Sequence, residues 1–244
     1  MNKNWFYIDI HSHILPGIDD GAADLDEALA MAGEAYEQGI RAIIATPHYG
    51  ISNPRADRAG TEEVFRETYS EIKKRWPDML MVLGNEVFYS TSSPEALHEG
   101  KAMTLYNTNY VLVEFYPDVT FRELEHGLRN LIHAGYRPVL AHIERYMCLE
   151  KKLDLVEELI EMGVYMQVNG RSFLRKRFDR RGSWCRTLLK NGMIHFVATD
   201  SHNSRHRSPV MAEVVKKMLS IADRETVYDL VFRNGMKLLK NQLI

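Results

Sequence analysis

Short runs of β-branched and aromatic residues recur along the chain and predict seven β-strands. The runs are Trp5–Ile10, Ala42–Thr46, Leu80–Leu83, Tyr110–Phe115, Pro138–Ala141, Tyr165–Val168 and Phe196–Thr199. Between most of these runs, hydrophobic positions with helical spacing predict helices at Leu25–Gln38, Thr61–Arg75, Phe121–Ala134, Leu153–Met162, Trp184–Lys190 and Val210–Ile221. Asp24 and Glu27 have the spacing of a capping box at the start of the first helix.

A glycine separates a predicted helix from the next strand at four places, Gly39, Gly135, Gly163 and Gly192. Glycine just past a helix end turns the chain back toward a sheet without a Cβ penalty. Repeated units of this kind predict an α/β fold with a parallel sheet. The chain has neither a Gly-x-Gly-x-x-Gly motif after the first strand nor a P-loop, which favours a barrel of βα units over a nucleotide-binding sheet. No linker divides the sequence, so we expect residues 1–244 to form one domain.

The charge balance narrows the classes of partner. The chain has 31 Lys and Arg against 33 Asp and Glu, a net charge of -2, and therefore lacks the basic excess that favours nucleic-acid binding. Its apolar runs are too short for a signal peptide or a membrane span, so we expect a cytoplasmic protein without membrane insertion. Two cysteines, Cys148 and Cys185, exclude both a disulfide framework and a Cys-rich zinc site.

Ionisable side chains follow six of the seven predicted strands. They are His11, His13, Asp19 and Asp20 after the first strand, His48 after the second, Glu86 after the third, Glu114 at the end of the fourth, His142 after the fifth, and Asp200 and His202 after the seventh. Only the sixth strand ends without one, at Asn169. Active sites of parallel barrels lie at these strand ends, where so many carboxylates and imidazoles require cations.

The pattern predicts a metal site. His11 and His13 lie on the same side of an extended segment, since strand side chains alternate, although His-x-His alone is a weak signal. Together with the other strand ends, it favours mixed His and carboxylate ligands, which suit Mn²⁺, Fe or Zn²⁺.

These residues resemble the polymerase and histidinol phosphatase (PHP) superfamily, whose fold is a distorted seven-stranded βα barrel with a metal cluster. More narrowly, the chain resembles the CpsB/YwqE-type bacterial protein-tyrosine phosphatases, nearly from end to end. The resemblance rests on Ile8-Asp9-Ile10-His11-Ser12-His13, Asp19-Asp20-Gly21, Ala141-His142-Ile143-Glu144-Arg145-Tyr146 and Asn241-Gln242-Leu243-Ile244.

The resemblance implies two or three divalent ions, with Mn²⁺ as the expected metal and Fe or Zn as the other candidates. It assigns the ligands in three groups: His11, His13, Glu86 and Asp200 for the first ion; Glu86, Glu114 and His142 for the second; and Asp20, His48 and His202 for the third. Asp20 rather than Asp19 is chosen by resemblance, because spacing does not separate the two. The phosphate-binding arginines correspond to Arg145 and Arg207, with Arg205 as the alternative to Arg207.

Such a cluster suits phosphate monoester hydrolysis. Adjacent divalent ions lower the pKa of a shared water and stabilise the leaving oxygen, while the arginines hold the phosphate oxygens. His48 or His202 would shape the proton path to the leaving oxygen, and neither is assigned as the general acid. By resemblance, the substrates are tyrosine-phosphorylated bacterial proteins, including the tails of tyrosine kinases of capsule or exopolysaccharide synthesis.

Other functions stay open at this point. A histidinol-phosphate phosphatase or another small-molecule phosphoesterase would use the same chemistry. A PHP exonuclease is disfavoured by the neutral charge, and a non-catalytic metal-stabilised module by the complete ligand set. A cysteine-based phosphatase is disfavoured because Asp154 and Asn191, rather than arginines, lie six residues after the two cysteines.

Several conspicuous residues have structural interpretations. His98, His126 and His133 fall in helical stretches, and His195 begins a strand at the end away from the cluster. The basic residues between Arg171 and Arg181 either attract an acidic phosphopeptide or form a solvated loop. Four aromatic residues after strands, Tyr49, Phe88, Tyr89 and Tyr116, line a slot for a phenol ring or pack at the rim.

Overall fold

Parallel strands form the centre of the structure, a computed structural model that describes residues 5–50 and 57–244. The strands are β1 (Tyr7–Ser12), β2 (Ile40–Ala45), β3 (His48–Tyr49), β4 (Leu80–Leu83), β5 (Glu86–Phe88), β6 (Tyr110–Glu114), β7 (Arg137–Leu140), β8 (Tyr165–Asn169) and β9 (Phe196–Ala198). They include all seven predicted runs, with shifts of a few residues at the ends. The short strands β3 and β5 were not predicted.

The two additional strands arise because β2 and β4 are interrupted. Hydrogen-bonded ladders give the orders β1-β2-β4 and β3-β5-β6-β7-β8-β9. Backbone hydrogen bonds continue across the breaks, since the Thr46 N–H donates to Ser12 O at 2.9 Å and the Glu86 N–H donates to Pro47 O at 3.2 Å. The interruptions place His48 on β3 and Glu86 on β5, which lies between β3 and β6, at the level of the candidate site.

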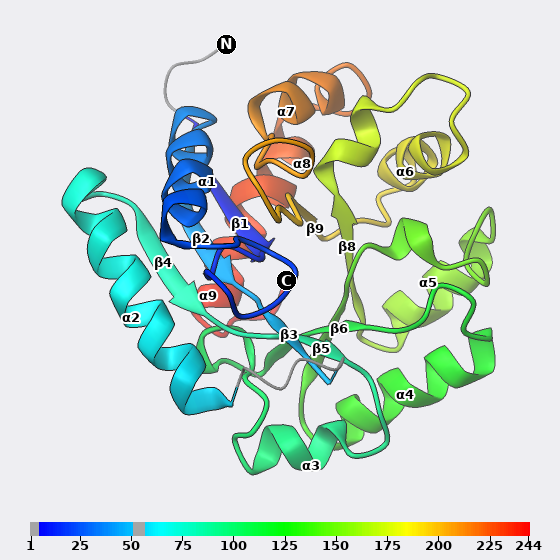
Figure 1. Cartoon of the computed structure of the whole chain (residues 1–244). Helices are drawn as coiled ribbons and strands as arrows, with labels where there is room; N and C mark the ends of the chain where they lie inside the picture. The colour runs from blue at the N-terminus through cyan, green and yellow to red at the C-terminus, as the bar shows by residue number, and fades with distance from the viewer. Residues whose placement is uncertain (1–4, 51–56) are drawn as a thin grey trace.

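The sheet curls until its first strand meets the segment after its last one. The His13 N–H donates to Ser201 O and the Asp200 N–H donates to His11 O, both at 2.9 Å. Buried Asp9 strengthens the junction, because its carboxylate accepts the Thr199 N–H at 2.8 Å. The helices form a ring around this curled parallel sheet (Figure 1), in agreement with the predicted barrel-like α/β class.

The helices that cover the sheet are α1 (Leu25–Glu37), α2 (Arg58–Arg75), α3 (Ser93–His98), α4 (Phe121–His133), α5 (Leu153–Glu161), α6 (Arg180–Lys190), α7 (Ala212–Met218), α8 (Arg224–Tyr228) and α9 (Asn234–Leu239). Short 3₁₀ turns lie at Leu105–Asn107 (η1), Ile143–Arg145 (η2) and Gly170–Leu174 (η3), and a π turn lies at Asp229–Arg233 (η4). The predicted helix at Val210–Ile221 is too long, and the predicted starts at Thr61 and Trp184 are too late. Asp57 and Asp179 cap the earlier starts of α2 and α6 through the Gly60 and Gly182 N–H groups.

The predicted capping box at Asp24 is only half formed. The Asp24 carboxylate accepts the Glu27 N–H at 2.9 Å, but the Glu27 carboxylate accepts the Ser204 N–H instead, at 2.7 Å. A tertiary contact to the loop after β9 therefore replaces the local one. The four glycines between helices and strands all have positive φ, as predicted.

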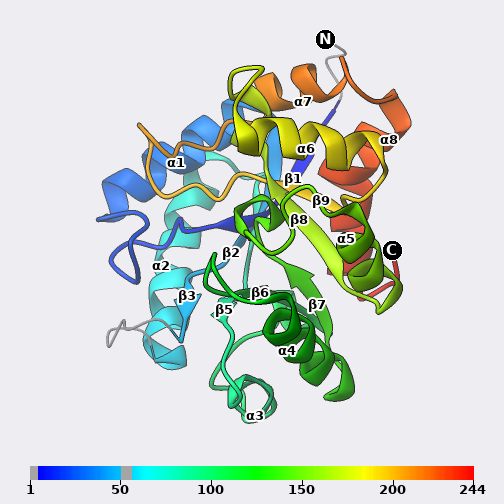
Figure 2. The same ribbon diagram turned by 90° about the vertical axis from the view of Figure 1, so that its right-hand side faces the viewer.

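Two layers of apolar side chains hold the sheet. One fills its interior and includes Ile10, Ile44 and Leu112, and the other lies between the sheet and the surrounding helices. The C-terminal segment closes the interior at the ends where the strands begin, since Leu238 belongs to the inner layer and the Tyr110 hydroxyl donates to Gln242 O at 2.7 Å. Figure 2 shows this red segment on one side of the sheet. Among residues 5–50 and 57–244, no helix is both long and apolar enough to cross a membrane.

Candidate metal centre

The predicted strand-end residues converge in one cluster. Three groups of side chains hold ligand atoms within 4.8 Å of one another: His13, Asp20, His48 and His202; His11, His13 and Asp200; and His48, Glu86 and Glu114. These residues come from segments that lie far apart in the sequence, and the parallel sheet brings their strand ends to one side.

Glu86 lies at the centre of the cluster. Its Oε2 lies 3.1 Å from His11 Nε2 and 3.2 Å from His13 Nε2, and its Oε1 lies 2.8 Å from His142 Nε2. The side chain is buried, so solvent compensates little of its charge. A carboxylate that faces several imidazoles with both oxygens has the geometry of a bridging ligand.

His11 and His13 face each other through the nitrogen atoms that a metal would use. Their Nε2 atoms lie 3.2 Å apart, and each is 3.6 Å from Asp200 Oδ1. The other nitrogen of each ring has its own partner: Gln167 Oε1 at 3.2 Å for His11 and Asp19 Oδ2 at 2.7 Å for His13. Such outer hydrogen bonds fix the tautomer that leaves Nε2 free to bind a cation.

Glu114, His142 and His48 surround the other side of Glu86. Glu114 lies 3.5 Å from His142 Nε2 and 3.1 Å from His48 Nδ1. The backbone of His142 is left-handed, with φ 35°, and its N–H donates to Gln167 Oε1 at 2.8 Å. This uncommon conformation turns the imidazole toward the cluster and is typical of functional sites.

Asp19 and Asp20 have different surroundings. Asp20 Oδ1 lies 3.4 Å from His48 Nε2 and 3.3 Å from His202 Nε2, whereas Asp19 accepts from His13 and from the His48 N–H. Gly21 makes this placement possible, because a Cβ there would lie 2.0 Å from His13 O. The geometry thus puts Asp20 within the cluster and Asp19 behind it.

Two arginines border the cluster through Asp200. Arg145 Nη2 donates to Asp200 Oδ2, and Arg207 Nη2 donates to Asp200 Oδ1 at 2.9 Å. Arg205 is exposed, and its backbone N–H donates to Asn203. Of the two alternatives, Arg207 is the one that shares Asp200 with Arg145. The Asn203 side chain shapes this loop, since it accepts the N–H groups of residues 205, 206 and 207.

The pKa values show how strongly the carboxylates attract positive charge. Burial lowers imidazole pKa values, yet hydrogen bonds to carboxylates outweigh it and raise the pKa of His13 and His142 to about 9 and that of His48 to about 11. Burial opposes ionisation of Glu86, but His11, His13 and His142 hold its pKa well below the usual range. A site that attracts protons this strongly fits divalent cations, and its oxygen and imidazole donors suit Mn²⁺, Fe or Zn²⁺.

Comparison with known proteins identifies the family. The sequence model of the CpsB/CapC family, which is described as a family of capsular polysaccharide synthesis, matches residues 7–240. The chain belongs to the CpsB/CapC family. It is 34% identical to the tyrosine-protein phosphatase CpsB of Streptococcus agalactiae serotype V, over 97% of this chain and 100% of the relative. It is 32% identical to the tyrosine-protein phosphatase YwqE of Bacillus subtilis, over 97% of this chain and 93% of the relative.

Solved structures agree with this family. A crystal structure from a study of YwqE of B. subtilis and CpsB of Streptococcus pneumoniae, described as unique metal-dependent tyrosine phosphatases, has a TM-score of 0.89 and 32% identity. It covers 97% of this chain, and this chain covers 96% of it. A phosphotriesterase homology protein from Escherichia coli, with a TM-score of 0.61 and 12% identity, shares the fold.

Beyond the ionisable residues, the CpsB/CapC chain uses two amides that the sequence reasoning missed. Gln167 bonds to His11 and to the His142 backbone, and its amide donates to Asn169 Oδ1 at 3.0 Å. Asn169 in turn donates to Asp200 Oδ2 at 2.6 Å. Strand β8, which ends without an ionisable residue, therefore contributes through neutral groups. Polar residues at positions 167 and 169, on one side of a buried strand, were the available signal.

The residues with structural interpretations lie away from the cluster. His98, His126 and His133 are exposed, and His195 Nδ1 accepts the Met166 N–H at 3.0 Å where β9 begins. Tyr89 stacks on Phe115, with ring centroids 4.9 Å apart, so it packs against the fold. Burial raises the thiol pKa of Cys185 well above its usual value and also raises that of Cys148, which opposes thiolate chemistry.

Proposed function

We propose that this chain is a metal-dependent protein-tyrosine phosphatase. The arrangement around Asp200 supports this proposal most. Its Oδ1 faces His11 and His13, and its two oxygens accept from two arginines, Oδ2 from Arg145 and Oδ1 from Arg207. A metal-binding group and a phosphate-binding group thus share one carboxylate. The relatives CpsB and YwqE carry the name tyrosine-protein phosphatase, and we extend that activity to this chain.

The proposed ligands form three groups around Glu86. His11, His13, Glu86 and Asp200 would hold the first ion; Glu86, Glu114 and His142 the second; and Asp20, His48 and His202 the third. We propose Mn²⁺ as the ion, because imidazole and carboxylate donors suit it. When bound, such ions lower the pKa of a water and neutralise charge on the phosphate and on the leaving oxygen.

Arg145 and Arg207 are the proposed phosphate-binding residues. Each guanidinium donates to Asp200 through Nη2, which leaves further N–H groups for phosphate oxygens. Asn169 also donates to Asp200, so the carboxylate keeps its position when an arginine turns to the substrate. Charge on the phosphate oxygens in the transition state strengthens these contacts.

His48 and His202 remain on the proposed proton path to the leaving oxygen. The His202 Nδ1 lies 3.0 Å from Asp200 O, which favours the tautomer with its proton on Nδ1 and leaves Nε2 facing Asp20. His48 is the more exposed of the two, so it is the more accessible to a leaving phenolate.

The proposed substrate is a tyrosine-phosphorylated bacterial protein, in particular the tail of a kinase of capsule or exopolysaccharide synthesis. The family description supports this choice, since it refers to capsular polysaccharide synthesis. We propose the cytoplasm as the place of action, which agrees with two unpaired cysteines, and one domain over residues 1–244 as the functional unit.

A comparison of substrates tests the proposal. The purified chain is loaded with Mn²⁺, its metal content is counted, and phosphate release is measured from a phosphotyrosine peptide, a phosphoserine peptide and histidinol phosphate. We expect selective hydrolysis of the phosphotyrosine peptide that a chelator abolishes and Mn²⁺ restores. A preference for histidinol phosphate would instead indicate a biosynthetic phosphatase with the same metal site, and undiminished turnover after complete metal removal would refute the metal mechanism.

A further inference from the structure

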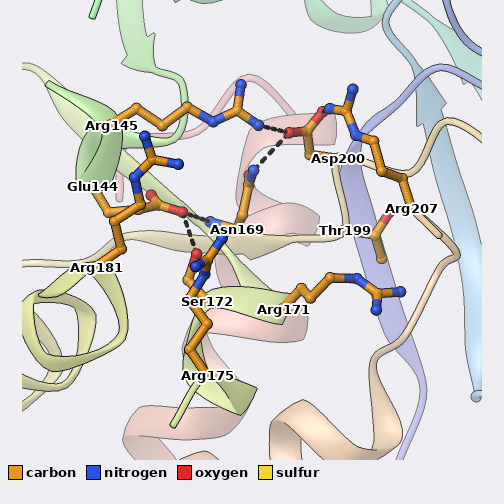
Figure 3. Close-up of a pocket in the computed structure, with 10 residues that line it drawn as sticks. All are labelled: Glu144, Arg145, Asn169, Arg171, Ser172, Arg175, Arg181, Thr199, Asp200 and Arg207. Atoms are coloured by element: carbon orange, nitrogen blue, oxygen red, sulfur yellow. Dashed lines mark hydrogen bonds and ion pairs between the residues drawn. The ribbon is translucent and has the colours of Figure 1, made fainter. Parts of the chain in front are cut away.

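A pocket lined by arginines extends from the phosphate-binding residues toward η3 and α6. Arg145 and Arg207 line it beside Asp200, and Arg171, Arg175 and Arg181 line the rest. Figure 3 shows Arg145 and Arg207 directed at Asp200, with Arg181 on the side of Glu144 and Arg171 on the opposite side of Asn169 and Ser172. The pocket thus extends beyond the two arginines that are proposed to hold the phosphate.

The two carboxylates that line this pocket already have partners. Asp200 accepts from Arg145, Arg207 and Asn169. Glu144 is buried, and its Oε1 accepts the Ser172 hydroxyl at 2.7 Å and the Asn169 N–H at 3.2 Å. Glu144 Oε2 is buried and has no hydrogen-bond partner among the described residues. Five arginines against two carboxylates still leave this pocket with an excess of positive charge.

Arg171 and Arg181 have no direct carboxylate partner among the described residues. Burial raises the pKa of Glu34 and the charge of Arg171 opposes that rise, while Arg180 and, more weakly, Arg181 lower the pKa of Glu150. Arg171 Nη2 donates to Ser208 O at 3.1 Å and to Ser208 Oγ at 2.9 Å, both neutral acceptors. Arg175 differs, because it pairs with Asp179 at 3.1 Å. Two guanidinium groups in one pocket thus retain donors for an anion from outside.

The arginine pocket is held in place by buried contacts. Glu144 lies in η2 beside Arg145, and its bonds to Asn169 and Ser172 fix the turn η3, which carries Arg171. The Ser208 contacts hold the Arg171 side chain toward the loop that carries Arg207. The shared support keeps Arg171 in a fixed relation to the phosphate-binding residues, so little ordering cost accompanies binding.

We propose that Arg171 and Arg181, on either side of this pocket, make it a second oxyanion subsite, which binds acidic groups of the substrate protein while its phosphotyrosine occupies the metal centre. The inference rests on the proposed function, because it assumes a phosphotyrosine beside Arg145 and Arg207. Carboxylates of Asp or Glu and the phosphate of a second phosphotyrosine share the required chemistry, since both offer oxygen pairs to a guanidinium. The subsite would select acidic or multiply phosphorylated segments.

A specificity ratio tests the subsite. Three phosphotyrosine peptides of one length carry neutral neighbours, two glutamates, or a second phosphotyrosine, and kcat/KM is measured for each with the Mn²⁺-loaded full chain. The test variant is Arg171→Ala with Arg181→Ala. The matched control is Lys176→Ala with Arg177→Ala, which also removes two positive charges from this basic segment. Both control residues are exposed and do not line the pocket.

We expect the wild-type chain to prefer the glutamate or the doubly phosphorylated peptide over the neutral one. The test variant should lower that preference about fivefold to tenfold, as expected for two partly exposed ion pairs, while the control keeps it. A loss confined to the glutamate peptide identifies an acidic side chain as the natural occupant, and a loss confined to the doubly phosphorylated peptide identifies a second phosphate.

The proposal is overturned if the wild-type chain shows no preference, or if the control lowers the preference as much as the test variant. Binding of the unphosphorylated glutamate peptide, measured by fluorescence anisotropy at low salt, separates the subsite from the activity. In one outcome, the wild-type chain hydrolyses no phosphotyrosine but still binds this peptide more tightly than the test variant binds it. That result would refute the proposed function and support the subsite. Equal binding by the wild-type chain and the test variant overturns the subsite.

Discussion

Replacing Arg145 by alanine distinguishes a phosphate-binding arginine from one that only holds a metal ligand. Arg145 pairs with Asp200, so its loss removes one partner of the carboxylate. Asp200 nevertheless retains Arg207 at 2.9 Å and Asn169 at 2.6 Å, which donate to its two different oxygens. We therefore expect Arg145→Ala to leave the metal content at the wild-type level.

The expected loss of activity follows from the contacts to the transition state. A guanidinium that donates to phosphate oxygens as their charge grows is comparable to one oxyanion-hole donor, whose removal costs about 10²- to 10³-fold in kcat. Arg145→Lys should recover only part of this loss, because an ammonium group lacks the paired planar donors. Stability should change little, since Arg207 and Asn169 still donate to the buried Asp200 carboxylate.

The assay measures kcat and KM for a phosphotyrosine peptide together with the metal content of each variant. Arg180→Ala is a suitable control, because Arg180 is an exposed arginine that pairs with Glu150 and does not line the arginine pocket. Loss of metal together with activity would show that Arg145 acts through Asp200. A loss of activity of about threefold or less would refute phosphate binding by Arg145, because it is far smaller than the loss expected for such a donor.

Three further predictions concern residues around the cluster. Cys148→Ser and Cys185→Ser should leave kcat/KM nearly unchanged, although the buried Cys185 variant should unfold at lower temperature; loss of turnover in a folded, metal-loaded variant would contradict this. Asp19→Asn should weaken metal affinity about 10- to 100-fold by removing the carboxylate behind His13, and excess Mn²⁺ should restore turnover; wild-type affinity in a metal titration would refute it. Burial lowers the pKa of His195 to about 4, so the unfolded chain binds more protons than the folded chain between about pH 6.5 and 4. Stability should therefore fall as the pH falls through this range, by at most about 3 kcal/mol, and His195→Asn should reduce that slope in urea unfolding, whereas an identical slope would exclude His195 as its source.

Much of the fold could be predicted from the sequence because its signals are local. Runs of β-branched residues, helical spacing and the glycines after helices depend on neighbours only a few residues apart. The interruptions of β2 and β4 depend on contacts between segments far apart in the sequence. For example, the N–H of Thr46 pairs with Ser12, a residue in another strand.

For the candidate site, the sequence by itself determined which strand ends carry imidazoles and carboxylates, because side-chain alternation and the parallel order place them on one side. Only the tertiary structure placed Asp20 beside His48 and Asp19 behind His13, since Gly21 lets this segment pass against the His13 backbone. It also placed the Arg207 guanidinium against Asp200, in a loop that the Asn203 side chain holds through backbone N–H groups. The roles of Gln167 and Asn169 required the structure too, because a neutral amide acquires its function from partners far away in the sequence.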